Sequence, residues 1–178
     1  METIQIKDKK FKIFLSEGQI LKEVERVAQE MNRDLVGEEP LFVSVLNGSF
    51  MFTSDLMKNI NFPSEISFVK LASYSGVSST GVIKNLVGLS NNIKGRTVVI
   101  VEDIIDTGHT MKHLLEIIKE KNPKKVIVAT LLLKPDKLQI PLDIDYVAIK
   151  IPNDFIVGYG LDYDGYGRNL RDIYSVVE

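Results

Sequence analysis

The first strong pattern in the chain is a helical repeat of apolar residues behind a short polar stretch. Ser16 and Gln19 have the spacing of a capping box, in which each side chain bonds a backbone amide at the first turn of a helix. Behind them, apolar residues recur three and four positions apart: Ile20, Leu21, Val24, Val27, Ala28, Met31 and Leu35. This spacing predicts an amphipathic helix over 16–36. Gly37 is well placed to end it, because glycine suits a helix C-terminus.

The rest of the chain alternates short apolar runs with segments of helical spacing. The runs predict strands over 41–46, 66–71, 82–89, 97–101, 126–133 and 146–149. Helices are predicted over 49–59 and 109–121. Residues 73–81 are rich in Ser and Gly between two predicted strands, which indicates a long flexible hairpin. Strands that alternate with helices predict an α/β fold, with a mostly parallel twisted sheet flanked by helices.

Composition and charge narrow the class of protein. The 178 residues suit one domain, and a hydrophobic content of 44% with 26% charged residues is that of a folded protein. Lys plus Arg number 22 and Asp plus Glu 24, a balance that argues against a dedicated nucleic-acid-binding protein. The lack of cysteine excludes disulfides, thiolate metal sites and a cysteine nucleophile, and it fits a cytoplasmic location. No apolar run approaches the ~20 residues that a membrane-spanning helix needs.

Residues 98–110 carry the candidate chemistry. The segment runs from an apolar strand through Glu102 and Asp103 to Asp106, and a predicted helix begins within residues 107–110. Ligands of open α/β sheets bind beyond the carboxyl ends of the strands, and helix N-termini favour anions. Three acids would repel a bare phosphate. A sugar phosphate removes the conflict, because residues 107–110 can hold the phosphate while the acids bind ribose hydroxyls or Mg²⁺, with one acid left for proton transfer.

The same segment matches neither of two common nucleotide-binding fingerprints. The Walker A pattern G-x-x-x-x-G-K-[ST] is absent, and no G-x-G-x-x-G follows the first strand. The purely structural alternative is a helix capped after an acidic turn, since Asp and Thr are good N-caps. That alternative explains any one of these residues but not the whole string.

At residues 102–108, EDIIDTG, the chain resembles the phosphoribosyl-pyrophosphate (PRPP) motif of type I phosphoribosyltransferases, in the form found in their 6-oxopurine branch. Other segments resemble that family in the same order along the chain. They are the pyrophosphate loop at 46–49, the flexible catalytic loop at 73–74, the purine-reading strand at 131–134, the base-stacking and metal-binding segment at 155–163, and the C-terminal Arg168. The resemblance spans residues 1–178 as a single phosphoribosyltransferase domain. It implies a type I phosphoribosyltransferase fold, with a small hood formed by the chain ends.

The resemblance also implies an activity and a set of site residues. The activity is purine salvage, in which Mg²⁺-dependent transfer of the 5-phosphoribosyl group from PRPP to hypoxanthine, and to guanine as a second base, releases pyrophosphate. Catalysis falls to Asp106, which would face the purine N7, and to Ser73 and Tyr74. The PRPP-binding residues would be Glu102, Asp103, Asp106, Thr107, Gly108, His109 and Thr110, and the pyrophosphate-binding residues Asn47, Gly48, Ser49 and Arg168. The purine-binding residues would be Lys134, Phe155, Ile156 and Asp162, and the Mg²⁺ ligands Glu102, Asp103 and Asp162. The implied protein is a homodimer or homotetramer that binds neither nucleic acid nor a membrane.

Two residues depart from the family's pattern. Asn47 stands where many members carry a basic residue, and the peptide bond before it is often cis in the family. His109 stands where lysine is frequent, and it is either a solvated loop side chain or a neighbour of the phosphate.

Two alternative functions remain open from the sequence. One is a transferase that prefers xanthine or guanine, which would differ in contacts to the purine 2-position from residues 156–162. The other is a regulator that kept the fold to sense a nucleotide and bind RNA. The near-neutral charge argues against the regulator, because affinity for a phosphate backbone comes largely from Lys and Arg.

Overall fold

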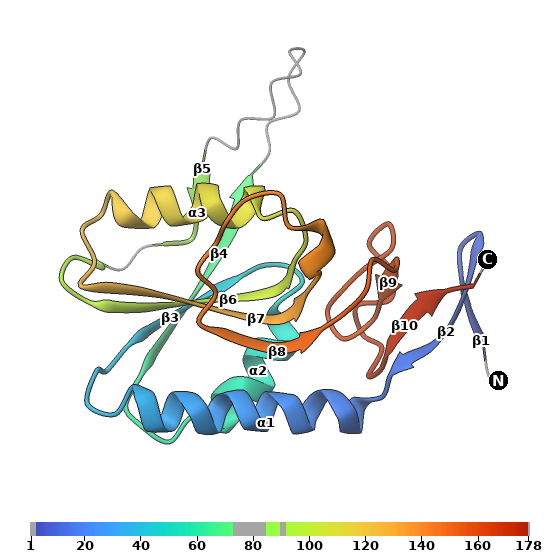
Figure 1. The fold of residues 1–178 in the computed structure, drawn as a ribbon, viewed down its shortest axis with the longest axis horizontal. Helices are drawn as coiled ribbons and strands as arrows, with labels where there is room; N and C mark the ends of the chain where they lie inside the picture. The colour runs from blue at the N-terminus through green and yellow to red at the C-terminus, as the bar shows by residue number, and fades with distance from the viewer. Residues whose placement is uncertain (1–2, 73–84, 90–91, 178) are drawn as a thin grey trace, which may run out of the picture.

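A central sheet of mostly parallel strands forms the body of the molecule (Figure 1). The computed structural model describes residues 3–72, 85–89 and 92–177. The strand order is β5-β4-β3-β6-β7-β8, and all neighbours are parallel except β5, which runs antiparallel to β4. The bounds are β3 Leu41–Val45, β4 Glu65–Ala72, β5 Asn85–Val87, β6 Thr97–Ile105, β7 Lys125–Leu133 and β8 Tyr146–Lys150. The predicted α/β class is confirmed.

Helices cover both faces of this sheet, as the apolar character of its central strands requires. Helices α1 (Glu17–Asp34) and α2 (Phe50–Lys58) lie on one face, and α3 (His109–Lys119) lies on the other (Figure 1). Along β6 the buried side chains alternate between the two layers. Val99 and Val101 pack into the core that contains α1 and α2, whereas Val98 and Ile100 pack into the core beneath α3.

Strand β6 is longer than its apolar run predicts. The prediction that the strand ends at residue 101 was wrong, because pairing with β7 continues through Glu102–Thr130, Ile104–Leu132 and Ile105–Leu133. Glu102 and Asp103 therefore lie inside the strand, whose backbone fixes their directions. The described residues do not include 73–81 of the predicted hairpin or 82–84 of its second predicted strand.

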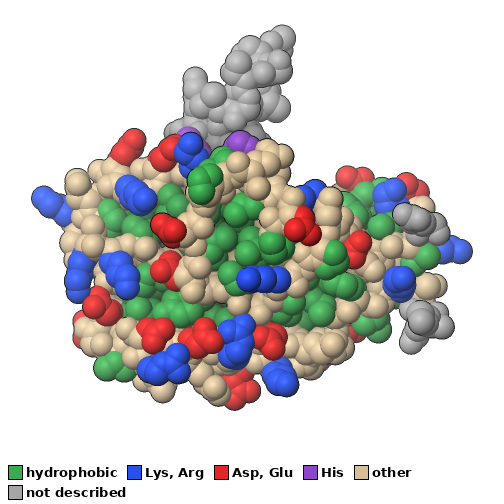
Figure 2. Space-filling view, viewed as in Figure 1, with side chains coloured by type: hydrophobic (Ala, Val, Ile, Leu, Met, Phe, Trp, Pro, Cys, Tyr) green, Lys and Arg blue, Asp and Glu red, His purple; other side chains and the backbone are tan. Residues whose placement is uncertain are grey.

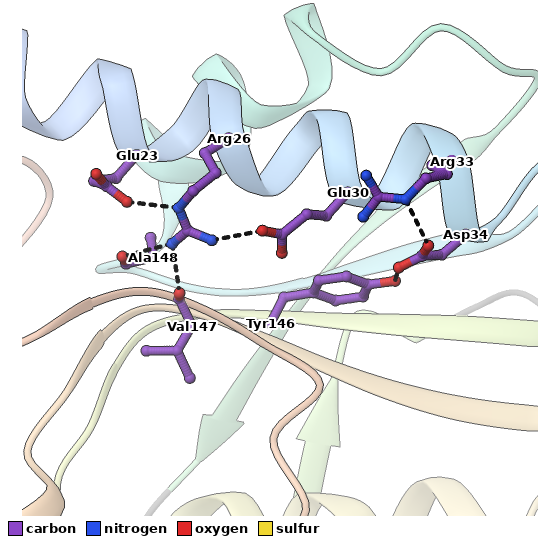
Figure 3. A network of polar contacts seen from close by, with 8 residues as sticks. All are labelled: Glu23, Arg26, Glu30, Arg33, Asp34, Tyr146, Val147 and Ala148. Carbon is purple, nitrogen blue, oxygen red and sulfur yellow. Dashed lines mark hydrogen bonds and ion pairs between the residues drawn. The ribbon is translucent and has the colours of Figure 1, made fainter.

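Helix α1 begins and is anchored as its polar residues suggest. The predicted capping box is present, with reciprocal bonds between Ser16 and Gln19. Farther along, the Arg26 guanidinium ties α1 to β8, the edge strand of the sheet (Figure 3). Its acceptors are Glu23 at 2.7 Å, Glu30 at 2.8 Å, and the carbonyl oxygens of Val147 at 3.0 Å and Ala148 at 2.9 Å.

A second, antiparallel sheet forms the hood that the family resemblance implies. Its strand order is β1-β2-β10-β9, so both ends of the chain meet in it (Figure 1). The bounds are β1 Thr3–Ile6, β2 Lys9–Leu15, β9 Ile156–Val157 and β10 Ile173–Val176. These strands were not predicted individually, since most are too short to show a periodic pattern.

On one face of the molecule, charges of both signs are mixed. Figure 2 shows a face on which Lys and Arg are interspersed with Asp and Glu around apolar side chains, without a continuous stretch of positive charge. Among the described helices, none combines the length and apolar character needed to cross a bilayer.

Candidate active site

The candidate site lies at the carboxyl ends of β3, β6 and β7, where ligands of open α/β sheets bind. A cavity of about 270 Å³ opens there. Its lining runs through residues 102–108 and includes Leu46 from the loop after β3 and Leu71 from β4. The loops that leave these strands bring distant parts of the sequence to one place.

Glu102 and Asp103 form an acidic pair at the end of the central strand, with Glu102 buried and Asp103 partly exposed. Burial raises the pKa of Glu102 well above its ordinary value, and the negative charge of Asp103 adds to the effect. Burial also raises the pKa of Asp103, although a hydrogen bond from the Ile104 amide (2.8 Å) and the positive charge of Arg168 favour its ionised form. Both acids would ionise more readily beside a bound cation.

Asp106 lies in the turn after β6, with its two carboxylate oxygens in different surroundings. Oδ2 lies 3.2 Å from Lys137 Nζ and 3.8 Å from Lys134 Nζ. Oδ1 is buried and has no hydrogen-bond partner in the described part of the chain. A buried carboxylate oxygen without a partner is costly unless a ligand supplies the missing donor.

Residues 107–110 form the start of α3, as predicted. Gly108 has a φ of 90°, in the left-handed region, and precedes His109, the first residue of the helix. The turn leaves the first amides of α3 at the cavity, where they can bind an anion. His109 contacts Gln139 through Nε2 and Oε1 at 3.1 Å.

The loop at 46–49 meets the acidic strand at very close range. The Leu46–Asn47 peptide bond is cis. A Cβ at Gly48 would overlap the carboxylate of Asp103, and a Cβ at Gly160 would overlap the carbonyl oxygen of Gly48. Glycine is therefore required at position 160, where the clash is with backbone, whereas a side chain at position 48 would force the Asp103 carboxylate to move. Two loops and the end of β6 meet at this point.

Ser49 differs from its neighbours in the same loop. Its side chain is fully buried, and its hydroxyl contacts the Ser44 hydroxyl at 2.7 Å and donates to the Val45 carbonyl at 2.5 Å. Ser44 contacts Thr53 of α2 at 2.7 Å as well. The hydroxyl of Ser49 thus serves the packing of α2 on β3, and its backbone amide also donates to the Val45 carbonyl, at 3.4 Å, so both groups are engaged within the protein.

The predicted purine-binding residues come together beneath the hood. Lys134 is almost fully buried, burial lowers its pKa, and its ammonium donates to the Asp154 carbonyl at 2.8 Å. The neighbouring Phe155 is 45% exposed, and its ring meets the edge of Tyr163 at 5.6 Å between centroids. Ile156 is buried in β9. An exposed aromatic face beside a buried ammonium suits a flat base that carries a carbonyl oxygen.

Arg168 and Asp162 are paired with each other in the loop below the hood. Arg168 Nη2 lies 2.7 Å from Asp162 Oδ1, and Nη1 donates to the Gly160 carbonyl at 2.7 Å. The other oxygen of Asp162 accepts from the Gly165 amide at 2.7 Å. Both oxygens of Asp162 are therefore engaged, so a metal bound there would displace one of these partners.

The acidic residues of the site suit Mg²⁺ only when a bound substrate supplies further oxygen ligands. The described residues include no group of three or more acidic or histidine side chains able to hold a metal. Mg²⁺ usually binds one or two carboxylates and completes its shell with substrate phosphates and water. The pair Glu102 and Asp103, whose ionised forms burial disfavours, has that character.

Two predicted residues fall outside the described part of the chain, and one contact of Asp106 was not predicted. Ser73 and Tyr74 lie outside the described residues. Conversely, Lys137 contacts Asp106 but was not singled out from the sequence. Its only signal was a second cation three residues after Lys134, a spacing that a turn can fold back onto the same site.

Comparisons with known proteins agree on one family. A family model described as "Phosphoribosyl transferase domain" matches residues 12–164. A hypoxanthine-guanine phosphoribosyltransferase of Streptococcus mutans is 41% identical over 172 residues, which cover 92% of this chain and 96% of the relative. A protein of the same name from Streptococcus agalactiae is 42% identical over the same shares of both chains.

Solved structures point the same way. A hypoxanthine-guanine phosphoribosyltransferase of Bacillus anthracis superposes with a TM-score of 0.83 at 37% identity, covering 94% of this chain and 97% of that one. A hypoxanthine phosphoribosyltransferase of Staphylococcus aureus gives 0.84 at 35% identity, over 93% and 91% of the two chains. The chain therefore belongs to the phosphoribosyltransferase family, among the hypoxanthine-guanine phosphoribosyltransferases.

Proposed function

We propose that this protein transfers the 5-phosphoribosyl group of PRPP to hypoxanthine and guanine, with Mg²⁺, and releases pyrophosphate. The observation that carries the proposal is the meeting of three features at one strand end. These are the acidic pair of β6, the free amides of α3, and Asp106 beside two lysines. The names of the relatives support the same reaction.

The residues divide the work according to their chemistry. The amides and hydroxyls of 107–110 bind the 5-phosphate, and Glu102 and Asp103 accept hydrogen bonds from the ribose hydroxyls. The bond from a purine nitrogen to ribose C1 forms as the bond to pyrophosphate breaks, and positive charge develops on the ribose ring. The acids of β6 stabilise that charge.

Residues on three segments bind the purine and take up the proton that it releases. Phe155 stacks on the base, Lys134 donates to its 6-oxo group, and the backbone of Ile156 borders its edge. The carboxylate of Asp106 accepts from the purine N7–H, and the proton that the base releases can pass to it.

The leaving pyrophosphate binds the loop at 46–49 and Arg168, whose planar guanidinium suits phosphate oxygens. Glu102 and Asp103 would hold Mg²⁺, with Asp162 as a further ligand once it gives up one of its present partners, and the ion would neutralise the charge of the pyrophosphate. Ser73 and Tyr74 keep their predicted role of closing over the ribose.

A turnover assay tests the proposal directly. Purified protein with PRPP and Mg²⁺ is offered hypoxanthine, guanine, xanthine and adenine separately, with EDTA as the control, and absorbance reports product. We expect rapid, EDTA-sensitive use of hypoxanthine and guanine. Preference for xanthine would contradict the proposed base range. No turnover of any base, with PRPP still bound, would contradict the enzyme and direct attention to an RNA-retention assay.

We also propose that the protein forms a homodimer or homotetramer. Three large apolar side chains of α2 and β4 are exposed side by side, Phe50 at 41%, Ile66 at 42% and Phe68 at 44%, and they line one groove with Met57. Such clusters are often covered by another protein surface. Light scattering after gel filtration should give a multiple of 20.0 kDa, and Phe68→Glu should reduce it. A monomer in the unmodified protein would contradict this assignment.

A further inference from the structure

Lys137 makes a contact with Asp106 that the reaction described above does not use. It ends the short turn η1 (Pro135–Lys137), directly after β7. Its Nζ lies 3.2 Å from Asp106 Oδ2, closer than the 3.8 Å of Lys134 Nζ. Lys134 instead donates to the Asp154 carbonyl at 2.8 Å. Lys137 is thus the nearer of the two cations to the proposed acid.

The backbone around Asp106 is fixed on both sides by the segment that carries Lys137. The residue before Asp106, Ile105, accepts a hydrogen bond from the Lys134 amide at 3.1 Å. The residue after it, Thr107, accepts one from the Gln139 amide at 3.0 Å. Residues 134–139 therefore run alongside the turn and hold it at both flanks. With the backbone held, rotation of the Asp106 carboxylate is the main freedom that remains.

The ion pair with Lys137 restricts that rotation. Oδ2 faces the two ammonium groups, whereas Oδ1 is buried and lacks a partner among the described residues. A rotation of the carboxylate out of its present plane, or a change of side-chain rotamer, would break the contact with Lys137. The ion pair therefore holds the carboxylate of Asp106 in one orientation.

We propose that Lys137 is a positioning residue for phosphoribosyl transfer: its ion pair holds the carboxylate of Asp106 in the orientation in which it can accept from the purine N7. Because Lys137 stays paired with Asp106, Lys134 can move away from Asp106 and bind the 6-oxo group of the base. The inference rests on the proposed function, because it needs Asp106 as the group that accepts from the purine.

Substitution of Lys137 by residues of similar length tests this role. Lys137→Met should lower kcat about tenfold and leave the KM for PRPP within about twofold, because a misplaced acid slows the transfer without removing a PRPP contact. Lys137→Arg should restore most of the kcat, since it keeps the cation. Lys22→Met, on the exposed side of α1, is the matched control and should leave both parameters unchanged. A loss that falls on KM alone would overturn the proposal.

A double-mutant cycle shows whether Lys137 acts through Asp106. In an Asp106→Asn background, Lys137→Met should lower kcat by less than about twofold, because the carboxylate it positions is gone. An equal loss in both backgrounds would overturn the proposal. If Asp106→Asn is strongly impaired but Lys137→Met alone is fully active, only the role of Lys137 fails. If Asp106→Asn is itself fully active, the proposed function of Asp106 fails with it.

Discussion

Two polar clusters of this molecule differ in whether their charged groups have partners within the protein. Between α1 and β8, the guanidinium of Arg26 has four acceptors, and the Tyr146 hydroxyl donates to Asp34 at 3.1 Å (Figure 3). At the carboxyl end of β6, the buried Glu102 is adjacent to the partly exposed Asp103, and one oxygen of Asp106 has no partner in the described part of the chain. The first cluster satisfies its own charges and supports the fold. The second leaves charges for a ligand to satisfy, which costs stability and creates a site.

The largest effect that this contrast predicts is at Asp106. Asp106→Asn should lower kcat by a hundredfold or more, because an amide keeps the shape but can neither carry the negative charge nor take a proton. The melting temperature should change by no more than ~2 °C, since the ion pairs of Asp106 are partly exposed and contribute little to stability. Steady-state kinetics and thermal unfolding of the same preparation provide the measurement. A well-folded variant with full activity would refute the assigned role.

The acidic pair predicts an inverse relation between activity and stability. The pKa of Glu102 is raised on folding, so its contribution to stability is full below the ordinary carboxyl pKa and is lost as pH rises through the raised value. Glu102→Gln removes the ionisable group, so the variant does not lose this stability as the pH rises. Without Mg²⁺ or PRPP, it should stabilise the protein at pH 8 by about 1 kcal/mol, or ~2–4 °C, while lowering activity.

The pH dependence provides the control for this prediction. At pH 4 the gain in melting temperature from Glu102→Gln should shrink, because the unmodified acid is then protonated in both the folded and the unfolded protein. A variant that is less stable than the parent at pH 8 would show that Glu102 supports the fold rather than the ligand.

The α1–β8 cluster predicts the opposite outcome. Arg26→Met should lower the free energy of unfolding by about 1 kcal/mol, or ~2–4 °C in melting temperature, because two strand carbonyls and two acids lose a shared donor. Activity per folded molecule should stay within about twofold. Arg33→Met is a matched control, since the single ion pair of Arg33 with Asp34 is 3.4 Å long and its side chain is 71% exposed. A clear loss of kcat in Arg26→Met would show that the α1–β8 cluster contributes to catalysis and not only to stability.

How far the sequence predicts this structure depends on the range of the interactions. The capping box of Ser16, the apolar run of β6 and the turn at Gly108 are local, and each was predicted correctly. Three of the four hood strands have four residues or fewer, and the hood forms by pairing the two chain ends, so no local pattern predicts how it is built.

The same limit applies within the site. The acids of residues 102–106 were found because they follow one another on one strand and turn. The engagement of the Ser49 hydroxyl by Ser44, and the pairing of Lys137 with Asp106, depend on packing between separate segments. The close approach of Gly48 to the Asp103 carboxylate likewise joins residues that are far apart in the sequence. Sequence patterns thus predict which groups are present more readily than which partner each group takes.

His109 predicts the smallest effect, because its polar contact is internal to the protein. Its Nε2 meets Oε1 of Gln139 at 3.1 Å, so the ring nitrogen there is the donor, since a carbonyl oxygen can only accept. In the neutral ring, Nδ1 then lacks a proton and cannot donate to a phosphate. The ratio of KM for PRPP between His109→Asn and the parent should stay within about twofold from pH 6 to pH 8. A ratio that grows toward pH 6 would show that the charged imidazolium contacts phosphate, and His109 would then belong with the ligand-directed charges of β6.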